Sequence, residues 1–191
     1  MKIKVAVFCS GSGSNAEKIF EYFKNHSQIE VGLLLVNNSK AYAIERARKF
    51  NIPVIIFNKE EFNNGSVLKH LQDHHISWVV LAGFLWLIPP HLVAGFENRM
   101  INIHPALLPK YGGKGMYGSY VHEAVVENKE TESGITIHLV NQHFDDGKVL
   151  FQAPCAIAPT DTALEVAKKV QYLEHSYFAS TIEKAILENL R

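Results

Sequence analysis

Short apolar runs alternate along the first half of the chain with stretches in which apolar residues recur every three or four positions. The apolar runs predict β-strands, and the longer period predicts helices that bury one face. Strands are expected at Ile3–Phe8, Val31–Val36, Val54–Phe57, Trp78–Ala82 and Met100–His104. Helices are expected at Asn15–Lys24, Ala41–Phe50, Val67–His75 and Pro90–Phe96. Repeated strand–helix units of this length indicate a parallel sheet covered by helices on both faces.

The last third of the chain follows a different pattern. Two β-rich runs, Ile135–Val140 and Val149–Ala158, are separated by a short loop that contains Asp146-Gly147. Aspartate followed by glycine is a turn signal, so we expect an antiparallel return here. The fold class predicted is therefore α/β, with a doubly wound, mostly parallel sheet and an antiparallel C-terminal strand.

One helix is expected to close the chain. Thr162-Ala163-Leu164-Glu165 has the spacing of a capping box, which predicts a helix that runs to about Glu188. The 191 residues, of which 47% are hydrophobic, suffice for one well-filled core, and they contain no repeat or linker. We expect a single domain over residues 1–191.

Charge and apolar content exclude several classes of partner. Nineteen basic and nineteen acidic residues cancel, so no overall field attracts nucleic acid. The longest apolar stretch, Trp78–Pro90, is too short to cross a bilayer, and no basic, apolar leader opens the chain. Cys9 and Cys155 have neither a disulfide framework nor zinc-ligand spacing. We expect a cytoplasmic protein without nucleic-acid or membrane partners, either a monomer or a homodimer.

A glycine-rich turn, Ser10–Asn15, lies between the first strand and the first helix. Glycines permit positive φ and close backbone approach, and the N–H groups of a helix start can bind an anion. The spacing is neither a full GxGxxG nor a P-loop, which favours a single phosphate monoester at this turn, with Ser14 and Asn15 as side-chain donors. The alternative is a tight β–α turn with a side-chain cap.

Candidate chemistry lies in Asn102, His104 and Asp145. Strand alternation places Asn102 and His104 on one face, at the carboxyl end of a strand, where sites of open α/β sheets gather. An amide and an imidazole can donate hydrogen bonds to the oxyanion of a tetrahedral intermediate, and a carboxylate near the imidazole favours its charged form. This equipment suits acyl transfer without a covalent nucleophile. The alternative is a strand-end histidine and an ordinary Asp-Asp-Gly turn.

Three further segments are candidates for binding. The apolar segment Phe84-Leu85-Trp86-Leu87-Ile88 after the fourth strand is either a continued core strand or a slot for a planar heterocycle. The glycine-dense stretch Tyr111–Gly118 predicts a mobile loop able to close over a site. Gln171 and Glu174 share one face of the last helix, as a surface pair or as ligands for hydroxyl or amine groups. No HExxH motif is present, so no metal is expected.

These segments together resemble one enzyme family, the folate-dependent phosphoribosylglycinamide formyltransferases of purine biosynthesis. The resemblance rests on motifs from the first strand to the last helix: Gly11–Asn15, Val80–Phe84, Asn102–Pro109, His138 with Asp145, and Gln171 with Glu174-His175. It implies the formyltransferase fold and direct transfer of formyl from 10-formyltetrahydrofolate, a co-substrate, to the amine of glycinamide ribonucleotide, without a metal.

The resemblance also implies roles for individual residues. Asn102, His104 and Asp145 would be catalytic, and Gly13, Ser14, Asn15, Gln171 and Glu174 would bind the ribonucleotide. Phe84, Leu85, Trp86, Leu87, Ile88 and the loop from Val140 to Asp145 would hold the folate. Trp86 stands where many relatives carry a basic residue, and Asp146 leaves open which carboxylate acts.

Rival activities remain in view. A methionyl-tRNA formyltransferase is expected to add a basic RNA-binding domain, and a formyltetrahydrofolate hydrolase an N-terminal regulatory domain. A phosphoribosyl- or folate-binding module would bind ligand without turnover.

Overall fold

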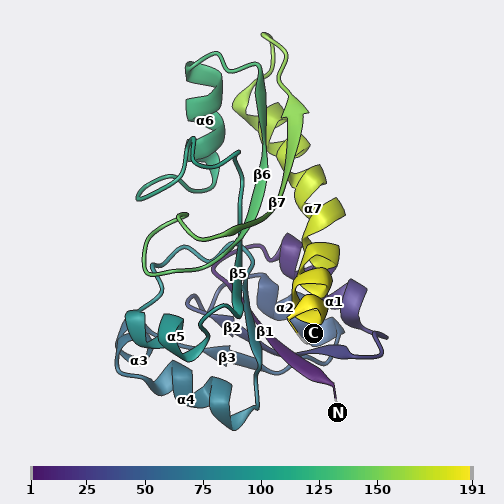
Figure 1. Ribbon diagram of the computed structural model, residues 1–191, viewed down its shortest axis with the longest axis vertical. Helices are drawn as coiled ribbons and strands as arrows, with labels where there is room; N and C mark the ends of the chain where they lie inside the picture. The colour runs from purple at the N-terminus through teal and green to yellow at the C-terminus, as the bar shows by residue number, and fades with distance from the viewer. Residues whose placement is uncertain (1, 190–191) are drawn as a thin grey trace.

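A seven-stranded sheet forms the centre of the structure, a computed structural model that describes residues 2–189 (Figure 1). The strands are β1 (Ile3–Cys9), β2 (Ile29–Val36), β3 (Val54–Ile56), β4 (Trp78–Leu81), β5 (Met100–His104), β6 (Glu132–Leu139) and β7 (Val149–Ala156). Their order across the sheet is β3-β2-β1-β4-β5-β6-β7. Pairs from β3 to β5 are parallel, whereas β6 is antiparallel to both β5 and β7. The predicted fold class is confirmed, with two strands in the antiparallel part.

Helices cover both faces of this sheet. They are α1 (Ser14–Phe23), α2 (Ala43–Lys49), α3 (Lys59–Asn63), α4 (Ser66–Asp73), α5 (Pro90–Gly95), α6 (Ser119–Glu127) and α7 (Ala163–Glu188). One apolar cluster joins the sheet to α1, α2 and α7, and a second joins the other face to α3, α4 and α5. Strand alternation divides the two cores: Val5 and Val7 of β1 enter the first, and Ala6 and Phe8 the second.

The predicted elements match those of the structure, with small differences at the ends and two omissions. Helix α3 is only one and a half turns long and escaped the periodicity, although Asn58 and Glu61 form a capping box at its start. Helix α6 begins at Ser119, directly after the stretch Tyr111–Gly118 that the sequence predicts as a loop, and no helix was predicted there. Its N-cap, Gly118, has φ 55° and makes no side-chain cap, so no start signal precedes it. Cys9 is buried, and Cys155 is partly exposed.

The parallel strands reverse their order of addition at β1, which has β2 on one side and β4 on the other. Ligands of open α/β sheets bind in the crevice at such a point. The loops that follow β1 and β4 are joined there: the Ser10 N–H donates to the Gly83 carbonyl at 3.1 Å, and the Leu85 N–H donates to Ser10 Oγ at 3.1 Å. Within residues 2–189, no helix combines the length and apolarity that a membrane span requires.

Candidate active site

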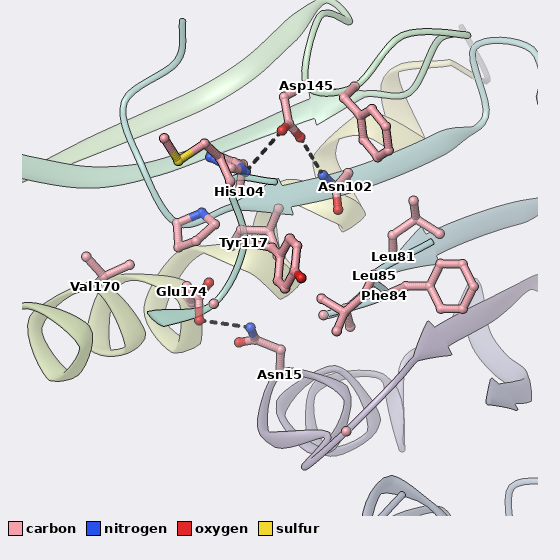
Figure 2. A pocket seen from close by; sticks show the side chains of 18 of the residues that line it. Asn15, Leu81, Phe84, Leu85, Asn102, His104, Tyr117, Asp145, Val170 and Glu174 are labelled. Carbon is pink, nitrogen blue, oxygen red and sulfur yellow. Dashed lines mark hydrogen bonds and ion pairs between the residues drawn. The ribbon is translucent and has the colours of Figure 1, made fainter. Parts of the chain in front are cut away.

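The carboxyl ends of β1, β4 and β5 open into one cavity of about 980 Å³ (Figure 2). The turn at Gly11–Asn15 and residues of α7 form one end, and the segment after β4 and the β6–β7 loop form the other. The stretch Gly113–Ser119 also lines it. All fourteen site residues predicted from the sequence line this cavity: Gly13, Ser14, Asn15, Phe84, Leu85, Trp86, Leu87, Ile88, Asn102, His104, Val140, Asp145, Gln171 and Glu174.

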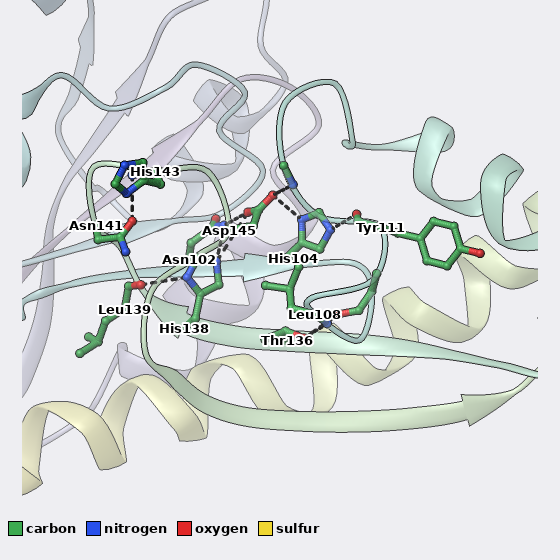
Figure 3. Close-up of polar contacts among 12 residues, drawn as sticks. Asn102, His104, Leu108, Tyr111, Thr136, His138, Leu139, Asn141, His143 and Asp145 are labelled. Atoms are coloured by element: carbon green, nitrogen blue, oxygen red, sulfur yellow. Dashed lines mark hydrogen bonds and ion pairs between the residues drawn. The ribbon is translucent and has the colours of Figure 1, made fainter.

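The sheet register places the polar groups of the site beside one another. Asn102 of β5 lies opposite His138 of β6, and His104 lies opposite Thr136. Asn102 Nδ2 is 3.1 Å from His138 Nε2 (Figure 3). It is also 3.5 Å from Oδ1 of Asp145, which lies in the loop after β6. Asp145 Oδ2 lies 3.4 Å from His104 Nδ1. The structure therefore brings the predicted amide, imidazole and carboxylate together.

Hydrogen bonds to backbone carbonyls assign the protons of the two imidazoles. His104 Nε2 lies 2.7 Å from the Tyr111 carbonyl, and His138 Nδ1 lies 2.9 Å from the Leu139 carbonyl. Because a carbonyl only accepts, each of these nitrogens carries a hydrogen. His138 Nε2 faces both Asn102 Nδ2 and, at 3.7 Å, Asp145 Oδ1. A neutral His104 turns the lone pair of Nδ1 toward Asp145, and protonation of Nδ1 converts that repulsion into an ion pair.

Burial and charge act in opposite directions on this group. Desolvation lowers the pKa of His104, and the Asp145 carboxylate and the Tyr111 carbonyl only partly offset it, so the neutral ring is preferred at neutral pH. Burial alone would raise the pKa of Asp145, but its contacts with His138, His104 and the Gly113 N–H hold that pKa below its usual value. The resting site is thus a neutral imidazole facing an ionised carboxylate.

The loop that carries Asp145 has a conformation that only certain residues tolerate. Asp145 itself has φ 53°, in the left-handed region where aspartate is better accommodated than most residues. A Cβ at Gly147 would lie 1.6 Å from the Leu139 carbonyl oxygen, so glycine is required there. Asp146 points away: its side chain is 69% exposed and lies near Asn141. Asp145 is therefore the carboxylate that reaches His104.

The turn after β1 also depends on glycine. Gly13 has φ 73°, and a Cβ there would lie 2.6 Å from Ala43 Cβ. The two residues that follow meet α7: Gln171 Nε2 donates to Ser14 Oγ at 3.4 Å, and Asn15 Nδ2 donates to Glu174 Oε2 at 3.0 Å.

These contacts join the four side chains predicted to bind one ligand. Burial raises the pKa of Glu174, and the Asn15 hydrogen bond opposes this only in part. The buried Oδ1 of Asn15 has no hydrogen-bond partner within residues 2–189 and is an acceptor available to a ligand.

The apolar segment after β4 divides its side chains between the core and the cavity. Phe84 and Ile88 are buried, and Phe84 packs in the second core against Phe8. Leu85 and Leu87 are 49% and 45% exposed, at the cavity wall. Alternate residues of this segment therefore continue the core, and the others form an apolar part of the cavity wall. The slot for a planar heterocycle stays a prediction.

Trp86 belongs more to the core edge than to the cavity. Its ring packs beside Phe57 and Phe62, and Lys59 Nζ lies 4.4 Å from its centroid. That geometry is a cation–π contact.

Some groups of the site were not assigned from the sequence. His138 entered only through the family resemblance, although the polar pair Thr136 and His138 has the same i, i+2 spacing as Asn102 and His104. That spacing, on a strand adjacent to β5, was the available signal. The Tyr111 carbonyl is a backbone group and leaves no such signal. Within residues 2–189, no cluster of three or more His, Cys, Asp or Glu side chains is placed to hold a metal ion.

Comparison with known proteins identifies relatives over nearly the whole chain. The formyl transferase family model matches residues 3–182. A chloroplastic phosphoribosylglycinamide formyltransferase of Arabidopsis thaliana is 40% identical over 98% of this chain and 67% of its own length. The Bacillus subtilis phosphoribosylglycinamide formyltransferase is 31% identical, over 98% of this chain and 97% of its own. The crystal structure of phosphoribosylglycinamide formyltransferase from Bacillus halodurans superposes with a TM-score of 0.87 at 33% identity, covering 95% of this chain and 94% of that one.

Proposed function

The chain belongs to the formyl transferase family and is a folate-dependent formyltransferase of the phosphoribosylglycinamide type, and we propose that it formylates the amine of glycinamide ribonucleotide with 10-formyltetrahydrofolate. The convergence of Asn102, His104 and Asp145 between an anion-binding turn and an apolar wall carries this proposal. One end of the cavity suits a phosphate and the other a heterocycle. The reacting groups lie between the two.

The ribonucleotide would enter with its phosphate at the turn before α1. Gly13, Ser14 and Asn15 present backbone N–H groups and short polar side chains at the start of a helix, which favours an anion. Gln171 and Glu174 flank the same turn from α7 and are placed to meet ribose hydroxyl groups. Glu174 can accept from a hydroxyl when ionised and donate to an oxygen when protonated.

The folate would lie against the opposite end. Leu85 and Leu87 offer apolar side chains, and Phe84, Trp86 and Ile88 support them from the core. Val140 lines the cavity at the start of the loop that ends in Asp145. A flat heterocycle here gains apolar contact, while free backbone groups of both segments can hydrogen-bond its ring edge.

Asn102 would stabilise the charge that develops on the formyl oxygen. When the amine attacks the formyl carbon, the carbonyl oxygen becomes an oxyanion, and donors placed around it lower the barrier. The Asn102 amide currently donates toward His138 and Asp145. The oxyanion would replace one of these acceptors, and loss of such a donor typically costs about 10²–10³ in rate.

His104 and Asp145 would handle the proton that the amine must lose. Nδ1 of the neutral His104 ring carries a lone pair and faces Asp145 at 3.4 Å. A proton that leaves the amine can be held on Nδ1, because the carboxylate stabilises the imidazolium that results. The same proton is then available to the folate nitrogen as it departs. His104 Nε2–H remains a donor, toward Tyr111 or toward the reacting oxygen.

The test is the dependence of turnover on the ribonucleotide. The protein mixed with 10-formyltetrahydrofolate and glycinamide ribonucleotide should release tetrahydrofolate and formylated ribonucleotide in equal amounts. Release of tetrahydrofolate and formate without the ribonucleotide would instead identify a hydrolase. Ligand binding with no product of either kind would identify a binding module and overturn the proposal.

A further inference from the structure

His122 is a buried polar residue of the cavity that the proposed mechanism does not use. It lies on α6 and is 7% exposed, and it lines the cavity together with Ser119. Its Nδ1 atom is buried and has no hydrogen-bond partner within residues 2–189. A buried ring with an unpaired nitrogen costs free energy unless a ligand or a suitable tautomer relieves it.

The environment of the ring selects one protonation state. Burial lowers the pKa of His122, and the nearby His104 lowers it further, so the ring is neutral at neutral pH. A hydrogen on Nδ1 would be a buried donor without an acceptor, and orphaned buried N–H groups are rarer in proteins than unpaired acceptors. The hydrogen is therefore assigned to Nε2, which, unlike Nδ1, is not a buried atom without a partner, in a residue that lines the cavity. His122 thus presents a neutral N–H donor to the cavity.

The position of α6 indicates which ligand this donor meets. Helix α6 packs against α7, the helix that carries Gln171 and Glu174 (Figure 1). The apolar wall comes instead from the segment after β4 and from the β6–β7 loop. His122 and His104 line the same cavity. The ring therefore lines the cavity from a helix that packs against α7, the helix assigned to the ribose side.

We propose that His122 contacts the ribonucleotide directly, by donating Nε2–H to an uncharged oxygen between its amine and its phosphate. The inference rests on the function proposed above and adds a recognition residue to it. The phosphate itself is assigned to the turn before α1, so the partner of a neutral donor here is an amide, ether or hydroxyl oxygen. The contact exists before and during the reaction, and it therefore contributes to substrate affinity more than to turnover.

Three substitutions separate the donor from the bulk of the ring. In His122→Gln the side-chain amide nitrogen reaches the place of Nε2, whereas in His122→Asn it reaches only the place of Nδ1. His122→Leu removes both nitrogens and keeps an apolar side chain. Glu127→Gln, on the exposed face of the same helix, is the control for changes in α6.

Calorimetry would measure the Kd of glycinamide ribonucleotide and of a folate analogue for each variant, together with steady-state kinetics. We expect His122→Leu and His122→Asn to weaken ribonucleotide binding by about 10-fold, the equivalent of one lost hydrogen bond of about 1.4 kcal/mol. His122→Gln should recover most of this loss. The Kd of the folate analogue should change less than twofold in all of them.

The inference fails if wild type transfers formyl and His122→Leu binds the ribonucleotide as tightly as wild type does. It also fails if Gln and Leu lose affinity equally, or if folate binding falls in parallel, since either result indicates a packing role. A wild-type protein that does not bind the ribonucleotide at all would overturn the proposed function together with this inference.

Discussion

Thr136 is a fully buried hydroxyl that holds the chain segment following His104, and its removal is the sharpest test of the structure. Thr136 Oγ1 donates to the Ala106 carbonyl at 2.7 Å and accepts from the Leu108 N–H at 2.9 Å. Gln152 Nε2 also donates to it, at 2.8 Å. In Thr136→Val the shape is kept, but these groups lose their partner.

The cost can be worked from the burial of each group. The Ala106 carbonyl belongs to a residue that is 1% exposed, so leaving it unpaired costs about 1–3 kcal/mol. The lost bond from Leu108, which is partly exposed, adds about 1 kcal/mol. Gln152 is exposed and still donates to the Leu108 carbonyl, so it adds little. The free energy of unfolding should fall by about 3 kcal/mol, which lowers Tm by roughly 6–12 °C.

The matched variant is Thr136→Ser, which keeps the hydroxyl and loses only a methyl group, at a cost of about 1 kcal/mol. Urea denaturation followed by circular dichroism would give the free energy of unfolding of both variants. The more hydrophobic valine should be the less stable of the two. If Thr136→Val proves as stable as Thr136→Ser, or more stable, the hydrogen bonds assigned to this hydroxyl do not contribute as described.

Four further outcomes are expected. His104→Ala should lower kcat by about 10²–10³ with KM for the ribonucleotide within a few-fold; a loss confined to KM would remove its catalytic role. Asp145→Asn should lower kcat by about 10²–10⁴, whereas the same change at the exposed Asp146 should leave the rate near that of wild type. Wild-type activity should decline from pH 8 to pH 5 because the substrate amine becomes charged and can no longer attack. The lowered pKa of Asp145 keeps that carboxylate ionised over this range, so its own titration does not cause the decline. A flat pH profile would contradict the proposed proton transfer. Gly13→Ala combines a positive φ with a 2.6 Å approach to Ala43, so it should cost about 1–3 kcal/mol of stability and weaken ribonucleotide binding; an unchanged Kd would separate the turn from the phosphate.

The lowered pKa of Asp145 also determines how the stability of the protein depends on pH. Its folded-state pKa lies below the usual value of 3.8, so its contribution is fully present above that pH and is lost as the pH falls through the folded-state value. The free energy of unfolding of Asp145→Asn, measured at a series of acidic pH values, should therefore fall less steeply below pH 4 than that of wild type. Equal slopes would mean that the carboxylate is not stabilised by its neighbours in the folded protein.

Local pattern predicted most of the fold because most elements are long and have one clear period. The strand Met100–His104 was predicted with its observed bounds, since its apolar residues enter the two cores alternately. The short helices were harder to predict. Helix α3 spans five residues, and α6 follows a glycine-dense stretch that carries no helix-start signal. Detecting a helical period needs more residues than α3 contains, and locating a helix start needs a clearer signal than the one before α6.

The sequence predicted which residues line the site better than it predicted how their side chains contact one another. Strand alternation places Asn102 and His104 on one face from the sequence alone. Their contact with Asp145 depends on the antiparallel register between β5 and β6, and on a left-handed backbone at Asp145 itself. Buried strands rich in apolar residues on both faces do not reveal their register, so the contact of Asp145 with Asn102 and His104 cannot be predicted from the sequence pattern.

One stretch of chain engages both groups that handle the proton. The Tyr111 carbonyl accepts a hydrogen bond from His104 Nε2–H, and the Gly113 N–H donates to Asp145 Oδ2 at 3.0 Å. A ligand that binds His104 or Asp145 in place of these backbone groups would remove a contact that holds Tyr111–Gly118. By reciprocity, fixing Tyr111–Gly118 in place would weaken the affinity for that ligand by the same factor. Ligand affinity at His104 and Asp145 and the conformational order of Tyr111–Gly118 are therefore coupled through one equilibrium.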